Sequence, residues 1–167
     1  SDAAKLNHQL AEASLTVIQN KNQILPIQQF ENTNIAYVKI GEATGDYFLD
    51  RMRHYTSIEE LSLTEMLANH KDYTHIIVGL HQPDHSPFVK HKLSQEVIEK
   101  LKELCAQTKV NLVTFANPYS LLKLPLEACE SVVLAYQNGS IFQSKAAQLV
   151  FGGLGANGKL PVQIGSY

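Results

Sequence analysis

The sequence has little of what several classes of protein depend on. It has no tryptophan and only two cysteines among 167 residues. No apolar run approaches the ~20 residues that a membrane-spanning helix requires, and no signal-peptide pattern opens the chain. The 14 Lys and Arg face 16 Asp and Glu, so the formal net charge is −2. This balance argues against binding to the phosphate backbone of nucleic acid, because such proteins carry a basic excess.

Two cysteines are too few for a disulfide scaffold. Cys105 falls on the apolar stripe of an expected helix, and Cys129 stands just before an apolar strand. The chain has no C-x-x-C spacing, which is the usual sign of a redox pair. We therefore expect two free thiols that serve as small apolar side chains.

What the chain does have is an alternation of two hydrophobic periods. With 44% apolar and 18% charged residues, it can bury a sizeable core. Several short apolar runs are typical of strands covered on both faces, as in a parallel sheet between helices. The expected strands are 15–19, 35–40, 75–80, 111–115 and 131–136, with a last short one near 160–164.

The segments between these strands follow the helical period. Residues 94–108 carry one apolar stripe behind Ser94 as a cap, and 62–65 (SLTE) form a capping box. Further helices are expected over 45–55 and 143–151. The pattern predicts an α/β fold: a three-layer αβα sandwich with a mostly parallel sheet of five to six strands, in a single domain over 1–167.

In such sheets ligands bind beyond the carboxyl ends of the strands. The loop 41–46 (GEATGD) follows a strand, but it lacks the glycine spacing of a phosphate cradle. Glu42 and Asp46 would also repel phosphate. The loops at this edge are 41–46, 81–92, 116–122 and 137–142.

The loop 81–91 (HQPDHSPFVKH) holds three histidines and an aspartate. Their spacing follows no metal-ligand motif, and two prolines keep the loop extended. Lys90 and Lys92 flank the last histidine and would oppose a cation. We expect no metal site and no cofactor, and a polar surface or interface loop is the favoured interpretation.

Asp84, His85 and Ser86 do not form a nucleophile system, because triad members meet through the fold rather than as sequence neighbours. A further interpretation of this loop is that Asp84 and one histidine reach a carbohydrate at the surface of a neighbouring domain. Tyr119 follows Asn117-Pro118 at a strand end, where its ring can pack, stack on a sugar or bond across an interface. The residues supply no self-sufficient active site.

The two ends of the chain carry a specific pattern. Residues 11–20 (AEASLTVIQN) and 24–27 (ILPI) resemble the entry into the second domain of family 3 glycoside hydrolases, with Gln19 where a basic residue is usual. Residues 146–153 (AAQLVFGG) and 158–162 (GKLPV) resemble the helix, glycine turn and Gly-Lys-Leu-Pro-Val close of the same domain. The resemblance spans nearly the whole chain.

Two inner segments indicate a branch of the family. Residues 115–119 (FANPY) and 133–136 (VLAY) are more similar to the branch that acts on N-acetylglucosaminides than to the β-glucosidase branch. The β-glucosidase branch has a Gly-x-Glu segment after the third strand, and residues 79–82 (GLHQ) stand there instead. No acid/base glutamate therefore carries over.

The resemblance implies that the chemistry lies elsewhere. Family 3 enzymes place their aspartate nucleophile on a preceding (β/α)8 barrel, and the N-acetylglucosaminidase branch also takes its acid/base His–Asp pair from a barrel loop. A barrel needs about 250 residues. We therefore expect no catalytic residue here, and the start at Ser1 without Met agrees with a domain excised from a longer chain.

The leading expectation is an accessory domain of a bacterial β-N-acetylhexosaminidase-like or β-glucosidase-like enzyme. It would pack on the barrel and help to complete the sugar site, with His81, Asp84, His85 and Tyr119 as substrate-proximal candidates. The resemblance also implies a carbohydrate substrate, a further β-lactamase-like domain in some relatives, and a periplasmic or extracellular location.

Two alternatives remain at this point. The first is a stand-alone flavodoxin-like or response-regulator-like binding or regulatory module, although no acidic pocket with a strand-end Asp and Lys is evident. The second is a small metal-dependent hydrolase that uses the loop 81–91.

Overall fold

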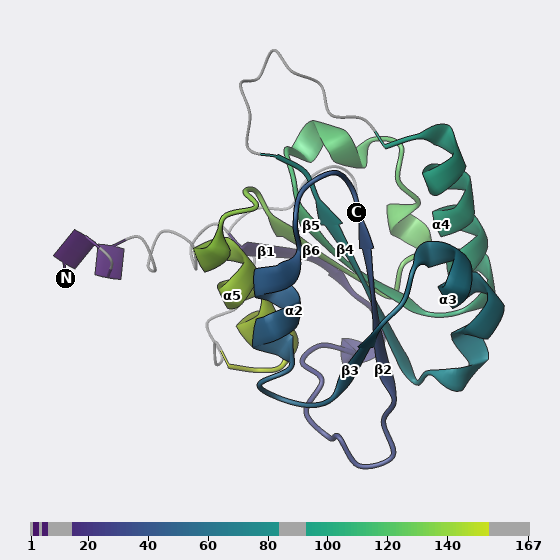
Figure 1. Ribbon diagram of the computed structural model, residues 1–167, viewed down its shortest axis with the longest axis horizontal. Helices are drawn as coiled ribbons and strands as arrows, with labels where there is room; N and C mark the ends of the chain where they lie inside the picture. The colour runs from purple at the N-terminus through teal and green to yellow at the C-terminus, as the bar shows by residue number, and fades with distance from the viewer. Residues whose placement is uncertain (1, 4, 7–14, 84–92, 154–167) are drawn as a thin grey trace.

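A computed structural model describes the chain except for residues 1, 4, 7–14, 84–92 and 154–167. Its centre is one six-stranded sheet with the strand order β1-β6-β5-β4-β2-β3 (Figure 1). Strands β2 to β6 run parallel, and β1 joins the edge antiparallel to β6. The strands are β1 Leu15–Asn20, β2 Ile35–Ile40, β3 Ile58–Glu60, β4 His75–His81, β5 Val110–Phe115 and β6 Ser131–Ala135.

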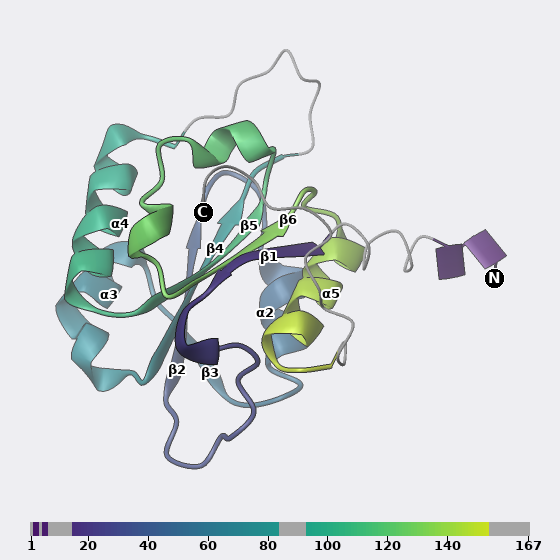
Figure 2. The ribbon, with the colours of Figure 1, turned by 180° about the vertical axis from the view of Figure 1, so that it is seen from behind.

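Helices cover both faces of the sheet. Helices α2 (Asp46–Met52) and α5 (Ser140–Val150) lie side by side on one face, and α3 (Leu63–Asn69) and α4 (Gln95–Gln107) cover the other (Figures 1 and 2). This arrangement confirms the three-layer αβα sandwich and its mostly parallel sheet. Short 3-10 helices fill the connections: η1 Lys21–Gln23, η2 His70–Asp72, η3 Pro118–Leu121 and η4 Leu126–Ala128.

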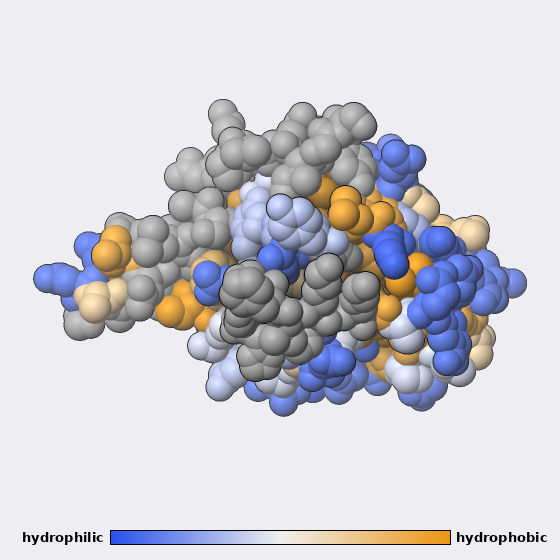
Figure 3. Space-filling model, turned by 90° about the horizontal axis from the view of Figure 1, so that it is seen from above, coloured by the Kyte–Doolittle hydropathy of each residue, from blue (hydrophilic) through white to orange (hydrophobic). Residues whose placement is uncertain are grey.

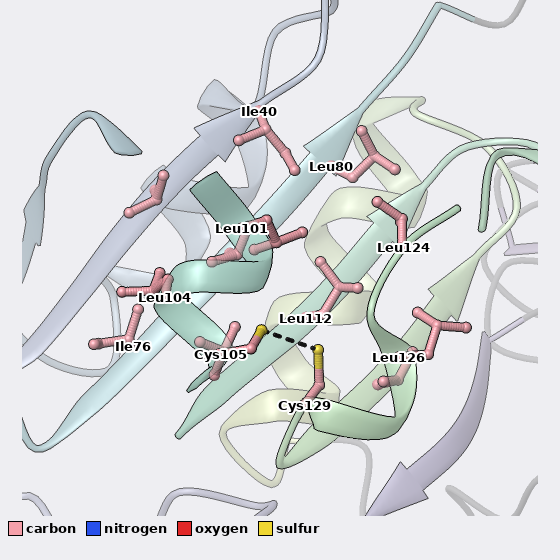
Figure 4. Packing of buried hydrophobic residues seen from close by; sticks show 14 of the residues in the cluster. Ile40, Ile76, Leu80, Leu101, Leu104, Cys105, Leu112, Leu124, Leu126 and Cys129 are labelled. Carbon is pink, nitrogen blue, oxygen red and sulfur yellow. Dashed lines mark hydrogen bonds between the residues drawn. The ribbon is translucent and has the colours of Figure 1, made fainter. Parts of the chain in front are cut away.

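Alternating side chains of the central strands supply the two halves of the core. On β4, Val78 and Leu80 face the α3 and α4 layer, whereas Ile77 faces α2 and α5. Leu112 of β5 joins the first half (Figure 4). All of these side chains are buried, as the continuous apolar runs predict for strands between two helical layers.

Local signals set the helix boundaries. The Ser62 hydroxyl accepts from the Glu65 amide at 3.1 Å and the Glu65 carboxylate accepts from the Ser62 amide at 3.0 Å, which confirms the capping box. Ser94 caps α4 by accepting from Val97 N at 3.2 Å. Helix α5 ends before Gly152, whose φ of +85° gives the left-handed stop that glycine favours.

Two differences from the expected elements have clear reasons. Strand β3 was not predicted, because only Ile58 of its three residues is buried and Glu59 and Glu60 face solvent. Strand β4 extends to His81, which the sequence pattern assigns to a loop. The expected strand near 160–164 lies outside the described residues.

The order of the parallel strands defines where a ligand would be sought. Along the chain β2 is the first parallel strand, and its neighbours are β3 and β4. The connections after β2 and after β4 therefore leave the sheet in opposite directions, which is the topological switch point of an open α/β sheet. Among the described helices, none is long and apolar enough to cross a bilayer.

Candidate functional site

His81 occupies the switch point. It is the last residue of β4, beside β2 on one side and β5 on the other, and its side chain faces the α2 and α5 layer. The residue is 0% exposed. A polar ring in this position must find its hydrogen-bond partners inside the protein.

Both ring nitrogens of His81 have such partners. Nε2 lies 2.7 Å from the Tyr37 hydroxyl, and Nδ1 lies 2.7 Å from Asn138 Oδ1. Asn138 turns its amide nitrogen to the Thr44 carbonyl at 3.0 Å, so its oxygen is left to accept from the imidazole. Nδ1 therefore carries the proton, and Nε2 accepts from the tyrosine. The contacts define one tautomer of a neutral imidazole.

The hydrogen-bond chain continues into both helices. Gln143 of α5 donates to the Asn138 carbonyl at 2.6 Å and to the Thr44 carbonyl at 3.3 Å. Its Oε1 accepts from Phe48 N, in the first turn of α2, at 2.9 Å. These hydrogen bonds thus connect β2, β4 and the loop before α5 with the first turns of α2 and α5.

Aromatic rings and glycines enclose the imidazole. His81 stacks on Phe115, with ring centroids 4.5 Å apart and planes 10° apart, and Phe48 lies at 6.0 Å. A Cβ on Gly45 would lie 2.3 Å from the Tyr37 hydroxyl, and one on Gly79 would lie 2.6 Å from His81 Nε2. The sequence can place these rings together only because both positions lack a side chain.

Burial controls the ionisation of this cluster. Burial lowers the pKa of His81 to about 4, although the hydrogen bond to Asn138 raises it. The charge of Lys39 also lowers this pKa, and the charge of Asp46 raises it. Burial also raises the pKa of Tyr37 well above its ordinary value. Near neutral pH the imidazole is uncharged and the phenol keeps its proton, as the hydrogen bonds require.

The loop after β2 closes over the end of β4. Ala43 N donates to the His81 carbonyl at 3.0 Å, and Glu42 N donates to Gln82 Oε1 at 3.1 Å. Gly41 adopts a φ of +98°, and a Cβ there would collide with the His81 carbonyl oxygen. The switch point is therefore filled by side chain and backbone, and His81 is a positioning group in this structure.

The neighbouring connection after β5 presents apolar side chains to solvent. Tyr119 and Leu122 are each 81% exposed, whereas the nearby Leu121 and Leu124 are buried. The Asn117 side chain accepts from Tyr119 N at 3.0 Å and starts η3. Figure 3 looks onto this edge of the sheet, where hydrophobic groups reach the surface next to hydrophilic ones.

Of the four predicted site residues, the structure describes two, and their surroundings differ. His81 is enclosed and Tyr119 is open to solvent, while Asp84 and His85 lie outside the described residues. The described parts of the chain hold no cluster of three or more His, Cys, Asp or Glu side chains that could bind a metal. The prediction that these four residues approach a sugar stays a prediction.

Sequence reasoning missed the partners of His81. Tyr37 stands inside an apolar strand run, where a tyrosine is usually taken as core, and Asn138 and Gln143 lie about sixty residues further along the chain than His81. The one available signal was a histidine directly after five apolar or small residues, which places it at a buried strand end.

Comparison with known proteins gives the fold a context. No family model matches the sequence, and no curated protein matches it either. Solved structures do match. A β-glucosidase from Listeria innocua, determined with isofagomine, has a TM-score of 0.68 at 14% identity, over 87% of this chain and 25% of that one.

Two further structures cover slightly more of the chain. A β-glucoside phosphorylase matches with a TM-score of 0.69 at 13% identity, over 91% of this chain and 30% of its own. A fungal multi-domain GH3 β-N-acetylglucosaminidase with a GCN5-related acetyltransferase region gives 0.68 at 16% identity, over 91% of this chain and 18% of its own.

The matched chains are far longer than this one. This chain spans about a quarter of the length of the first of them, so it corresponds to a domain-sized region. At such low identity the likeness concerns the fold. The chain thus shares its fold with part of several β-glucosidases and of a GH3 β-N-acetylglucosaminidase, as expected for the second domain of a family 3 glycoside hydrolase.

Proposed function

We propose that this chain is the α/β accessory domain of a family 3 glycoside hydrolase of the N-acetylglucosaminidase-like branch, and that it packs on a (β/α)8 catalytic barrel. The observation that carries the proposal is the structural likeness to glycoside-active enzymes along 87–92% of this chain but 18–30% of theirs. The motifs at the two ends of the sequence agree with it independently.

The contents of the sheet edge support an accessory role rather than a catalytic one. In its most common form, retaining glycoside hydrolysis uses two carboxyl groups about 5 Å apart across the sugar. Where the β-glucosidase branch has its Gly-x-Glu segment, this chain has residues 79–82 (GLHQ), whose Gln82 is 4% exposed and accepts from the Glu42 amide. His81 is equally enclosed. Neither side chain supports proton transfer to a sugar in this conformation.

The open part of the same edge supports a contact with another domain. Tyr119 of η3 and Leu122, directly after this short 3-10 helix, expose large apolar side chains. A tyrosine ring with a free hydroxyl can stack on a sugar or pack against a protein surface. In this proposal η3 meets the barrel, Tyr119 lies at the border of the sugar site, and the hydrogen-bond chain of His81 holds the neighbouring loops in place.

The flavodoxin-like alternative shares the parallel strand order, so the fold alone does not separate the two functions. The contents of the switch point do distinguish the two functions. A flavodoxin-like module binds its ligand there, whereas here the Phe115 and His81 rings fill the space beneath the loop after β2. This observation favours the accessory domain.

Several finer features belong to the same proposal. The whole enzyme would act on N-acetylglucosaminides, come from a bacterium and reside in the periplasm or outside the cell. Some relatives would add a β-lactamase-like domain. These features rest on the sequence resemblance.

The test uses the natural full-length protein that contains this chain. We expect it to hydrolyse a chromogenic N-acetylglucosaminide, and the 167-residue chain alone to be inactive. Tyr119→Ala should raise KM by about three- to tenfold, the size of one lost aromatic contact. The matched control is Lys71→Ala, an exposed residue of η2 at the opposite edge of the sheet, which should leave KM unchanged.

Two results would contradict the proposal. One is a full-length protein without a barrel-length segment ahead of this domain. The other is turnover of the chromogenic substrate by the isolated 167-residue chain. An unchanged KM for Tyr119→Ala, with normal folding, would leave the domain assignment standing and remove Tyr119 from the sugar site.

A further inference from the structure

On the face of the sheet away from His81, the two cysteines contact each other. Cys105 lies in the last turns of α4 and Cys129 directly before β6, 24 residues further along the chain. Their Sγ atoms are 3.8 Å apart, and both side chains point into the gap between α4 and the segment before β6 (Figure 4). A disulfide bond is about 2.0 Å long. The two sulfurs therefore need to approach by only about 2 Å.

We propose that Cys105 and Cys129 are a reversible redox site, at which a small-molecule disulfide oxidises the two thiols to one intramolecular disulfide. That bond would join α4 to the segment before β6. The inference goes beyond the proposed function and does not depend on it.

Cys129 is held firmly in position. Its backbone N donates to the Leu126 carbonyl at 3.1 Å, and the next amide, Glu130 N, donates to the Val110 carbonyl of β5 at 2.8 Å. The Gln19 side chain of β1 donates to the Cys129 carbonyl. These bonds fix the backbone at Cys129, and the residue is 0% exposed.

Cys105 is held by its helix. Leu101 and Leu104 on the same face of α4 are fully buried, and Thr108 N closes the helix by donating to the Leu104 carbonyl at 3.0 Å. Cys105 itself is 9% exposed, and the neighbouring Ala106 and Gln107 face solvent. A small opening of the last turn would expose this sulfur while Cys129 stays covered.

The two thiols differ in reactivity as well as exposure. The hydrogen bond from Cys129 lowers the pKa of Cys105, with burial opposing this effect and the charge of Lys21 supporting it. The same hydrogen bond, together with burial, raises the pKa of Cys129. Because the thiolate is the nucleophile, Cys105 attacks first and Cys129 acts second.

The reaction balances as two thiol–disulfide exchanges. The Cys105 thiolate attacks one sulfur of oxidised glutathione, forms a mixed disulfide and releases one glutathione thiolate. The Cys129 sulfur then attacks the Cys105 sulfur, and its proton passes to the departing glutathione sulfur, so the second glutathione leaves as a thiol. The two protein thiols lose two electrons and two protons, and oxidised glutathione gains the two electrons.

The experiment measures the equilibrium constant for disulfide formation. The reduced 167-residue chain is equilibrated in glutathione buffers of graded ratio, quenched by alkylation and analysed by mass, once folded and once unfolded in urea. A contact pair held together by the fold should give a constant about tenfold or more above that of the unfolded chain. Cys105→Ser and Cys129→Ser are matched single-thiol controls that can reach only a mixed disulfide.

A folded-chain constant that exceeds the unfolded-chain constant supports the proposal. A folded-chain constant equal to or below it overturns the proposal, because the fold would then hold the thiols apart. Products that are only mixed disulfides or disulfide-linked dimers of the folded wild-type chain overturn it too. Far-UV circular dichroism on each sample establishes that the folded chain is compared with the unfolded one.

Discussion

Acid should destabilise this chain through one buried imidazole. The pKa of His81 is about 4 in the folded state, because burial disfavours the imidazolium, against an ordinary value of 6.5. The unfolded chain therefore takes up a proton at His81 at a higher pH than the folded chain. The stability supplied by the neutral imidazole is complete above pH 6.5 and is lost as the pH falls from 6.5 towards 4.

The structure sets the size of this loss. The two pKa values, 6.5 and about 4, limit the total to about 3 kcal/mol. Linkage then gives a loss of about 2 kcal/mol between pH 7 and pH 5 and about 3 kcal/mol by pH 4. This is a large share of the 5–15 kcal/mol that is typical of a domain.

The assay is urea denaturation of wild type and His81→Gln across pH 4 to 7.5. Glutamine cannot titrate, and its amide can still donate to Asn138, so this variant should start less stable at pH 7 and lose less on acidification. Taking the difference between the two curves removes the contributions that both proteins share, and His54→Gln is the control substitution at an exposed histidine. A difference curve that is flat between pH 7 and 4 would refute the reasoning.

Two backbone predictions use pairs of similar positions. Gly45 and Gly139 are both helix N-caps, but a Cβ on Gly45 would lie 2.3 Å from the Tyr37 hydroxyl while one on Gly139 would meet nothing closer than 3.8 Å. Gly45→Ala should therefore cost about 1–3 kcal/mol in urea unfolding and Gly139→Ala much less, and equal losses would contradict the close approach seen here. Ser62→Ala should cost about 1 kcal/mol by removing a capping-box hydroxyl, with exposed Ser57→Ala as the control; if both serine variants matched wild type, the capping bond would not contribute to stability.

Patterning predicts the central strands well because burial on both faces demands uninterrupted apolar side chains. The β-branched run Ile76-Ile77-Val78 is typical of a buried strand, and it lies in β4. Edge strands lack this constraint. Strand β3 pairs with β2 alone, and its Glu59 and Glu60 are exposed, so nothing in its composition distinguishes it from a loop.

The candidate site was less predictable, because its contacts join distant parts of the chain. The position of a histidine after an apolar run does not tell which partners its two nitrogens will find, and Asn138 is 57 residues away. The same holds for Cys105 and Cys129. Each thiol taken alone predicts a small buried side chain, and only the register of α4 against η4 brings the two into contact.

The antiparallel direction of β1 determines where a preceding domain would be attached. Leu15 pairs with Ala135, the last residue of β6, so the polypeptide enters the fold at the edge that also presents Tyr119 and Leu122. A domain joined there by a short flexible linker would face this surface at an effective concentration on the order of millimolar. Such a tether lets a small apolar contact hold two domains together, although the same contact between separate molecules would be too weak to persist.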